Sequence, residues 1–221
     1  MWKKIVYFGS LSLVAALLLL PVSAKAITMY TNEASFLSVL QTPYYLQYFN
    51  GRVADDGYGK AADPFSSAGN GYAYTVSTAS GNPGLWWVNS GLTTSGTGAT
   101  IVVAFTGAPV TAIGGFFWPT DASGKNLTDD ITFTLSNGTK YTILAASSST
   151  FTGFTTDGPA FTSISFQTVH SSISPQVYEY PTMSKLYVGA DPVPEPSSLI
   201  LLGSGLVGLG FYASNRKWRK K

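Results

Sequence analysis

The stretch "ITFTLSNGTKYTIL", residues 131–144, decides the fold class of this chain. Apolar residues alternate with threonine and serine from Ile131 to Leu135, and the alternation continues after the Asn137-Gly138 pair. A period of two is typical of a strand that buries one face. Asn-Gly between two alternating runs is a strong signal for a hairpin. We therefore predict an antiparallel hairpin with a tight turn at Asn137-Gly138.

Residues on both sides of this hairpin show the same character. Short runs rich in β-branched and aromatic residues are separated by Gly, Asn and Pro, which is typical of a sandwich or jelly roll. The sequence predicts strands at residues 44–49, 72–78, 85–89, 100–105, 110–118, 130–135, 140–144, 151–155, 161–168 and 184–188.

A short helix precedes these strands in "TNEASFLSVL", where Thr31 or Asn32 can cap the first turn. No internal repeat of fixed period is present, so neither a solenoid nor a propeller is expected. The prediction is an all-β protein with a single sandwich or jelly-roll-like domain at residues 27–189.

Composition limits the function classes. Charged residues make up 11% of the chain, against about 25% in ordinary soluble proteins. The absence of cysteine excludes disulfides, thiolate metal sites and cysteine nucleophiles. All eleven acidic residues lie in the segment 27–196, together with only five basic ones, so this segment has no basic patch. Nucleic acid is therefore not an expected partner.

The first 26 residues resemble a leader. Lys3 and Lys4 precede an apolar run, and Ala24-Lys25-Ala26 places small residues at the two positions that a signal peptidase reads. We predict that residues 1–26 are a secretory signal peptide, taken by the secretion translocon and removed by signal peptidase after Ala26. The alternative is an uncleaved membrane anchor.

The other end of the chain is also suited to a membrane. Residues 197–214 are 18 positions without a charge, and as a helix they would reach roughly 27 Å, close to a bilayer core of about 30 Å. The tail 215–221 should stay cytoplasmic because of the positive-inside rule. Its basic residues would act as a stop; they are Arg216, Lys217, Arg219, Lys220 and Lys221. We predict a transmembrane helix at 197–214 with the domain outside.

A plain anchor does not explain the linker 190–196, in which Pro192, Pro194 and Pro196 hold the backbone extended and open to an enzyme at the membrane surface. Pro194-Glu195-Pro196, the Gly-interrupted apolar segment and the basic cluster together resemble the PEP-CTERM sorting signal of bacterial surface proteins. That resemblance implies an exosortase, a membrane protease-like enzyme of Gram-negative bacteria that make exopolysaccharide or biofilm matrix. It also implies an inner-membrane-anchored precursor, cut near the motif, and a mature form at the cell surface or outside the cell.

The phrases "VTAIGGFFWPTD", "DGPAFTSISF" and "KLYVG" are similar to β-sandwich domains found ahead of such signals. Relatives would be expected to carry an Asp-Asn-like pair where this chain has Ser184-Lys185. A ligand role of that pair is therefore not carried over.

Catalysis has little support in the sequence. His170 is the only histidine, and its neighbours Ser171 and Ser172 do not make a triad, because triad partners meet through the fold. There is no nucleophile-elbow motif. We expect a non-enzymatic protein, and a secreted hydrolase is the remote alternative, since it would require a converging pair of carboxylates.

Two acidic segments suggest a calcium hypothesis, because Ca²⁺ takes six to eight oxygen ligands. The first holds Asp55, Asp56 and Asp63, and the second, which is the candidate site, holds Asp121, Asp129 and Asp130. The alternative is that they are solvated turn residues, with no cofactor.

Aromatic residues suggest a carbohydrate-binding module that uses the same export route. Trp86 and Trp87 should point to opposite faces of one strand, and Trp118 follows two phenylalanines in another. Exposed rings of this kind stack on sugars. The alternative is that core or loops cover both faces. We favour a sorted, non-enzymatic surface or matrix protein, with exopolysaccharide as a candidate partner.

Overall fold

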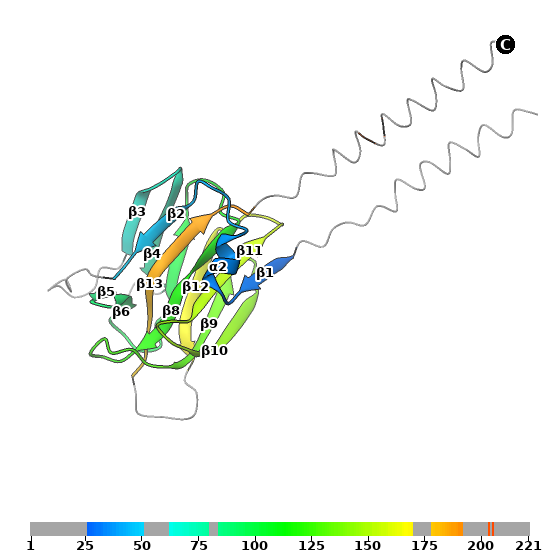
Figure 1. Ribbon diagram of the computed structural model, residues 1–221. Coiled ribbons are helices and arrows are strands. Elements are labelled where there is room, and N and C mark those ends of the chain that lie inside the picture. Colours follow the sequence, from blue (N-terminus) through cyan, green and yellow to red (C-terminus); the bar gives the residue numbers. More distant parts are fainter. Residues whose placement is uncertain are drawn as a thin grey trace, which may run out of the picture.

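The computed structural model describes residues 26–50, 62–79, 84–169 and 178–191, together with positions 203 and 205, and for 62–68 it describes the backbone alone. Two antiparallel sheets face each other across an apolar interior, so the all-β sandwich prediction is confirmed (Figure 1).

The first sheet has seven strands. Its middle strand, β13, pairs with β8 along most of its length, and on the other side with β2 and β6. In spatial order the sheet holds β1 (Ile27–Tyr30), β11 (Phe151–Thr156), β8 (Ala112–Thr120), β13 (Tyr180–Gly189), β6 (Gly91–Thr94) and β5 (Leu85–Val88), with β2 (Tyr45–Tyr48) beside β13.

The second sheet has six strands and contains the predicted hairpin at one edge. Its order is β10 (Lys140–Ala146), β9 (Asp129–Leu135), β12 (Ser163–Val169), β7 (Ile101–Phe105), β4 (Tyr72–Thr78) and β3 (Ala62–Gly69).

The predicted β9–β10 hairpin is present, with a tight turn that contains Asn137-Gly138. Lys140 pairs with Thr134, and the backbone N–H of Gly138 donates to the carbonyl of Leu135 at 2.8 Å. Gly138 has φ +85° and Asn137 is not left-handed. This is a turn closed by a left-handed glycine, the common three-residue hairpin loop, rather than a two-residue Asn-Gly turn.

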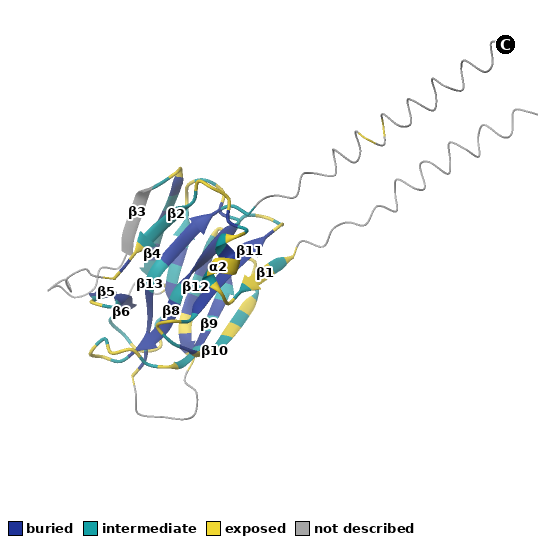
Figure 2. Cartoon of the chain, viewed as in Figure 1, coloured by how far each residue is buried: buried dark blue, intermediate teal, exposed yellow. Residues whose placement is uncertain are grey.

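The interior between the sheets is aromatic. Phe117 of the first sheet meets Phe133 and Phe166 of the second, with ring centroids 5.1 and 4.9 Å apart. Both contacts are edge-to-face, the arrangement that aromatic rings prefer. Dark blue strands in the middle of Figure 2 mark this buried layer.

A second apolar cluster covers the outer face of the first sheet. Helix α2 (Glu33–Leu37) begins at Asn32, whose side chain accepts from the N–H of Ser35 as an N-cap. The helix lays Phe36, which is fully buried, on Gly114 and Gly153, a pair of glycines directly opposite each other on β8 and β11. A Cβ at Gly153 would lie 2.7 Å from the Phe36 ring. The glycines therefore make the hollow that this ring fills.

The predicted strands all correspond to observed ones, with ends shifted by a few residues. Three strands were not predicted, namely β1, β3 and β6. Thr31 or Asn32 was the predicted cap, and the structure assigns this role to Asn32.

Candidate functional site

The three tryptophans of the carbohydrate hypothesis lie in different surroundings. Trp86 is 39% exposed, whereas Trp87 and Trp118 are 5% and 1% exposed. Trp87 packs on Phe49 in the interior, and the indole N–H of Trp118 donates to the side-chain oxygen of Asn126 at 2.8 Å. Trp87 and Trp118 therefore offer no ring face to a ligand, which corrects their place in the candidate set. Trp86 is the remaining candidate.

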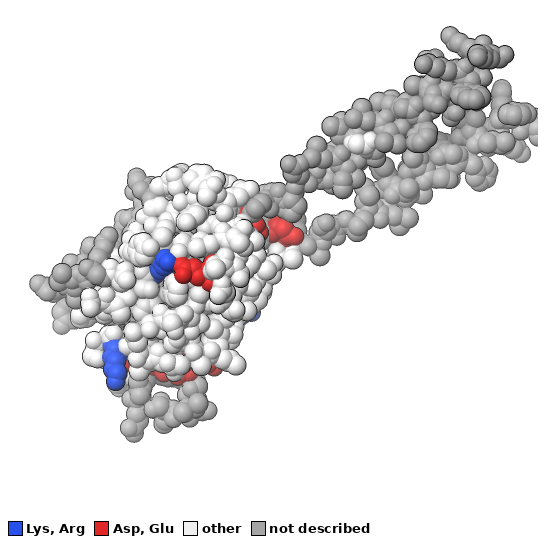
Figure 3. Space-filling model, in the orientation of Figure 1, with Lys and Arg blue, Asp and Glu red and all other residues white. Residues whose placement is uncertain are grey.

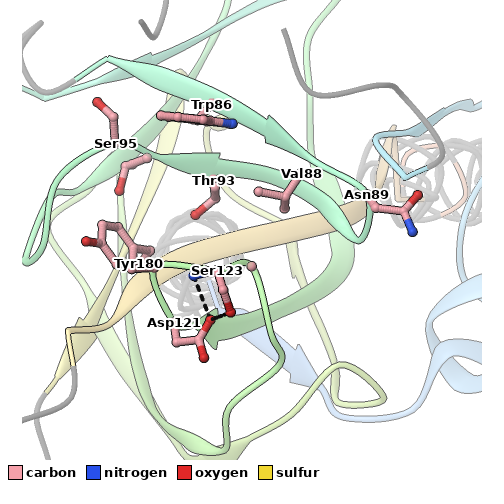
Figure 4. Close-up of a pocket in the computed structure, with 11 residues that line it drawn as sticks. Trp86, Val88, Asn89, Thr93, Ser95, Asp121, Ser123 and Tyr180 are labelled. Atoms are coloured by element: carbon pink, nitrogen blue, oxygen red, sulfur yellow. Dashed lines mark hydrogen bonds between the residues drawn. The ribbon is translucent and has the colours of Figure 1, made fainter. Parts of the chain in front are cut away.

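Trp86 lines a cavity of about 330 Å³, which we call the hairpin pocket. This volume lies at the lower end of the range for small-molecule sites. Figure 4 shows side chains of the β5–β6 hairpin on one side of it, with Asp121, Ser123 and Tyr180 across from them. The lining residues are Trp86, Val88, Asn89, Thr93, Thr94, Ser95, Asp121, Ala122, Ser123, Gly124 and Tyr180.

The hairpin wall is fixed by hydrogen bonds at several points. The backbone N–H and the hydroxyl of Ser95 both donate to the carbonyl of Gly84. Thr93 pairs with Trp86 across the hairpin, and its hydroxyl donates to the carbonyl of Pro181 at 3.0 Å. The platform that carries Trp86 is thereby joined to β13.

The opposite wall is the loop after β8. Oδ1 of Asp121 accepts from the N–H and hydroxyl of Ser123 and from the N–H of Lys125, at 2.6–2.9 Å. Gly124 has φ +77°, and a Cβ there would lie 3.2 Å from Val88 of the hairpin. The two walls therefore approach each other closely at Gly124 and Val88, which both line the pocket.

Asp121 gives the pocket its charge. The hydrogen bond from the Ser123 hydroxyl, followed by that from the Lys125 backbone, lowers the pKa of Asp121 below its ordinary value. The carboxylate is thus ionised at neutral pH. Charged side chains are otherwise sparse on the face of the domain drawn in Figure 3.

Asp129 and Asp130 do not join Asp121 at the pocket. Asp130 accepts from the N–H of Ala145 at 2.9 Å, while Asp129 hydrogen-bonds Glu179. Within the part of the chain that the structure describes, no three acidic or histidine side chains are grouped to hold a metal. Asp55 and Asp56 lie outside the described residues, as does the side chain of Asp63. Calcium binding therefore stays a prediction from sequence alone.

Glu179 is a buried carboxyl that the sequence did not single out, with 5% of its surface exposed. Desolvation, followed by the hydrogen bond that the protonated Glu179 donates to Asp129 and by the charges of Asp129 and Asp130, raises the pKa of Glu179 to about 7. Neither of the two cavities that the structure describes is lined by Glu179 or Asp129.

Lys185, at the position where an Asp-Asn-like pair was expected, forms an ion pair with Glu33 of α2. The Tyr187 hydroxyl donates to the same carboxylate oxygen. The Lys185 ammonium also lies over the rings of Tyr48, Phe116 and Tyr187, 4.9–5.6 Å from their centroids. This cluster fastens α2 to the first sheet.

Other predicted sites lie outside the described residues. These are the signal peptide up to residue 25, the residues His170, Ser171 and Ser172, the motif Pro194-Glu195-Pro196, and the basic cluster at 216–221. The predicted span 197–214 is described only at positions 203 and 205. No helix long and apolar enough to cross a membrane occurs among the described residues.

A comparison with protein families decides what the end of the chain is. A family model described as the PEP-CTERM protein-sorting motif matches residues 192–217. The chain carries a PEP-CTERM sorting motif. The match covers Pro194-Glu195-Pro196 and extends into the basic cluster, as the sequence predicted. No curated protein and no solved structure matches the chain.

The PEP-CTERM motif implies an exported, membrane-anchored precursor with an exosortase as its processing partner. The sequence found this motif because its three parts are adjacent in the chain. It did not find the hairpin pocket, because Trp86, Asp121 and Tyr180 come from three separate segments. The one signal in the sequence was the Trp86-Trp87 pair, because neighbouring residues of a strand point to opposite faces. The sequence did not show which of the two tryptophans is exposed.

Proposed function

We propose that this PEP-CTERM protein is a non-enzymatic component of the cell surface or extracellular matrix, released from a membrane-held precursor by an exosortase. The observation that carries the proposal is the sorting motif at residues 192–217. An exosortase needs an accessible backbone next to the membrane, and the proline spacing supplies one.

The place where the folded domain ends supports this proposal. Gly189 accepts from the N–H of Thr111, and the N–H of Asp191 donates to the hydroxyl of Thr111 at 2.8 Å. The motif begins at the next residue, Pro192. Hydrogen bonds therefore hold the chain to the domain as far as the residue before the motif. Cleavage within the motif would leave every strand intact.

Both processing boundaries lie at the same end of the domain. The N–H of Ala26 donates to the side chain of Asp157. Asp191 lies close to the same residue: its carboxyl is hydrogen-bonded by Thr155 and is repelled by the charge of Asp157. This juxtaposition suits a precursor whose signal peptide and C-terminal segment both insert in one membrane.

The proposed topology follows from the sequence. Signal peptidase removes residues 1–26, the segment 197–214 spans the inner membrane as a temporary anchor, and the basic tail stays in the cytoplasm. The mature domain, 27–189, then reaches the surface or the medium. Its association with exopolysaccharide or biofilm matrix is proposed from the resemblance of the motif. A secreted hydrolase remains the remote alternative.

Fractionation of a variant with Ala at Pro194, Glu195 and Pro196 tests the proposal. The substitution leaves hydrophobic length and basic flank unchanged, so membrane insertion should persist. We expect the variant to accumulate in the inner membrane with its full tail, while the unmodified protein reaches the surface or medium.

A matched control replaces three residues of an exposed loop, Ser147, Ser148 and Ser149, with Ala and should be sorted normally. Replacing the five basic residues of the tail with Gln should act differently, because it weakens the stop and lets uncut protein slip outward. Surface delivery of the 194–196 variant at the level of the control would contradict the proposal.

A further inference from the structure

We propose that the hairpin pocket binds neutral pyranose units of a polysaccharide, with Trp86 as the ring on which a sugar stacks. This function goes beyond sorting and does not depend on it.

Trp86 is the aromatic wall of the site. Its side chain lies on an edge strand and is 39% exposed, although Trp is a residue that folded proteins usually bury. Sugar rings present a face of C–H groups that packs on the electron-rich face of an indole. The opposite wall is held at Gly124 against Val88, so a ring on Trp86 would lie in a cavity and not on a flat surface.

Polar groups also line the pocket. The indole N–H of Trp86, the amide of Asn89 and the hydroxyl of Tyr180 make no hydrogen bond to other described residues. These groups include donors and acceptors, as sugar hydroxyls do. A site that is largely apolar, with a few polar groups placed around it, is the usual form of a small-molecule pocket.

The charge of the pocket selects among sugars. Asp121 is ionised and lines the cavity, and Lys125 contributes only from the adjoining loop. A carboxylate accepts hydrogen bonds from sugar hydroxyls but repels uronate or sulfate groups. The structure thus favours neutral over anionic polysaccharide.

The position of the pocket and the rigidity of its walls both suit an external ligand. Tyr180 is the first residue of β13, and the chain leaves toward the sorting motif after Gly189, the last one. Ten extended residues span roughly 30 Å, so the pocket lies far from the membrane-directed end. The hydrogen bonds of Ser95, Thr93 and Asp121 fix both walls before a ligand arrives.

Binding is tested on the full chain, purified in a detergent without a sugar headgroup, by biolayer interferometry on immobilised polysaccharides. The neutral probes are dextran, galactomannan and xyloglucan, and alginate is the anionic probe. We expect saturable binding to at least one neutral probe and none to alginate. Trp86→Ala and Trp86→Leu should each weaken it by roughly tenfold or more.

Tyr48→Ala is the matched control, because Tyr48 is an exposed aromatic outside the pocket, 53% accessible on β2. It should bind like the unmodified protein. Trp86→Leu keeps an apolar side chain, and its melting temperature shows whether the fold is retained. Absence of binding to all three neutral probes would overturn the proposal, as would unchanged binding by a folded Trp86→Leu variant. Neither result bears on sorting, since the purified precursor is measured before any processing.

Discussion

At the residue scale, two glycines of the first sheet allow helix α2 to pack against it. Gly114 and Gly153 lie side by side under Phe36, so the helix ring can approach the sheet backbone. In the sequence they look like two more turn-forming residues among 23 glycines. Their role follows only from the packing of α2.

Gly153→Ala should lower the free energy of unfolding by about 1–3 kcal/mol, because its Cβ would overlap Phe36. Adding Phe36→Leu should recover part of the loss, since the two sites are in contact. Gly138→Ala is the comparison: it has open space, and only its φ of +85° is unfavourable, so Phe36→Leu should not relieve it. Urea unfolding of all variants measures this, and strictly additive effects of positions 36 and 153 would refute the packing account.

Glu179 should make stability depend on pH. Its folded pKa, about 7, lies above the unfolded value near 4.3. The folded state therefore binds the proton more tightly, and the cost of ionising Glu179 is absent below the unfolded pKa and grows as pH rises to about 7.

Glu179→Gln should thus raise the free energy of unfolding at pH 8, by up to about 3 kcal/mol, and change it little at pH 4. Thermal unfolding at the two pH values checks this. A variant that is equally destabilised at both would show instead that the carboxyl is needed for packing.

At the element scale, α2 is held by an ion pair as well as by Phe36. Desolvation opposes ionisation of Glu33, but the hydrogen bonds from Lys185 and Tyr187, with the Lys185 charge, outweigh it and lower the pKa of Glu33. For a depressed folded pKa, the stabilisation is present above the unfolded value and lost as pH falls through the folded one.

Glu33→Gln should therefore destabilise the protein at pH 7 and flatten its acid-side loss of stability below about pH 4. Hydrogen exchange of the α2 amides measures the effect locally. An unchanged pH profile in the variant would mean that this pair does not fasten the helix.

The strands show what local pattern can and cannot predict. The β4 strand alternates strictly in burial, with aromatic or β-branched residues at the buried positions, and its predicted bounds, residues 72–78, are the observed ones. By contrast, β6 reads Gly-Leu-Thr-Thr and is buried at every position, so it has no period of two to detect. The β3 strand contains Pro64 and small residues, so its sequence resembles that of a loop. It lies at a sheet edge, where proline is tolerated.

The candidate site shows the same limit. Neighbouring tryptophans predict opposite faces, and Trp86 and Trp87 do differ in this way. Which face is covered depends on Phe49 and on the opposite sheet, which the local sequence does not encode. Trp118 is buried, and the partner of its indole N–H is Asn126, eight residues later in the chain.

At the scale of the whole molecule, the chain is a compact sandwich between two segments that we propose to be membrane-directed and temporary. The domain is stabilised by its own aromatic interior, and the sorting motif begins where its last hydrogen bonds end. Removal of either terminal segment should therefore leave the fold and the hairpin pocket unchanged.

The most direct test of this account is intact-mass spectrometry of the protein recovered from the cell surface or the medium. We expect a chain that begins at Ile27, ends near Pro194–Pro196, and lacks the remaining residues up to Lys221. Surface-localised protein that still ends at Lys221 would contradict it, and would leave a β-sandwich domain on a permanent anchor.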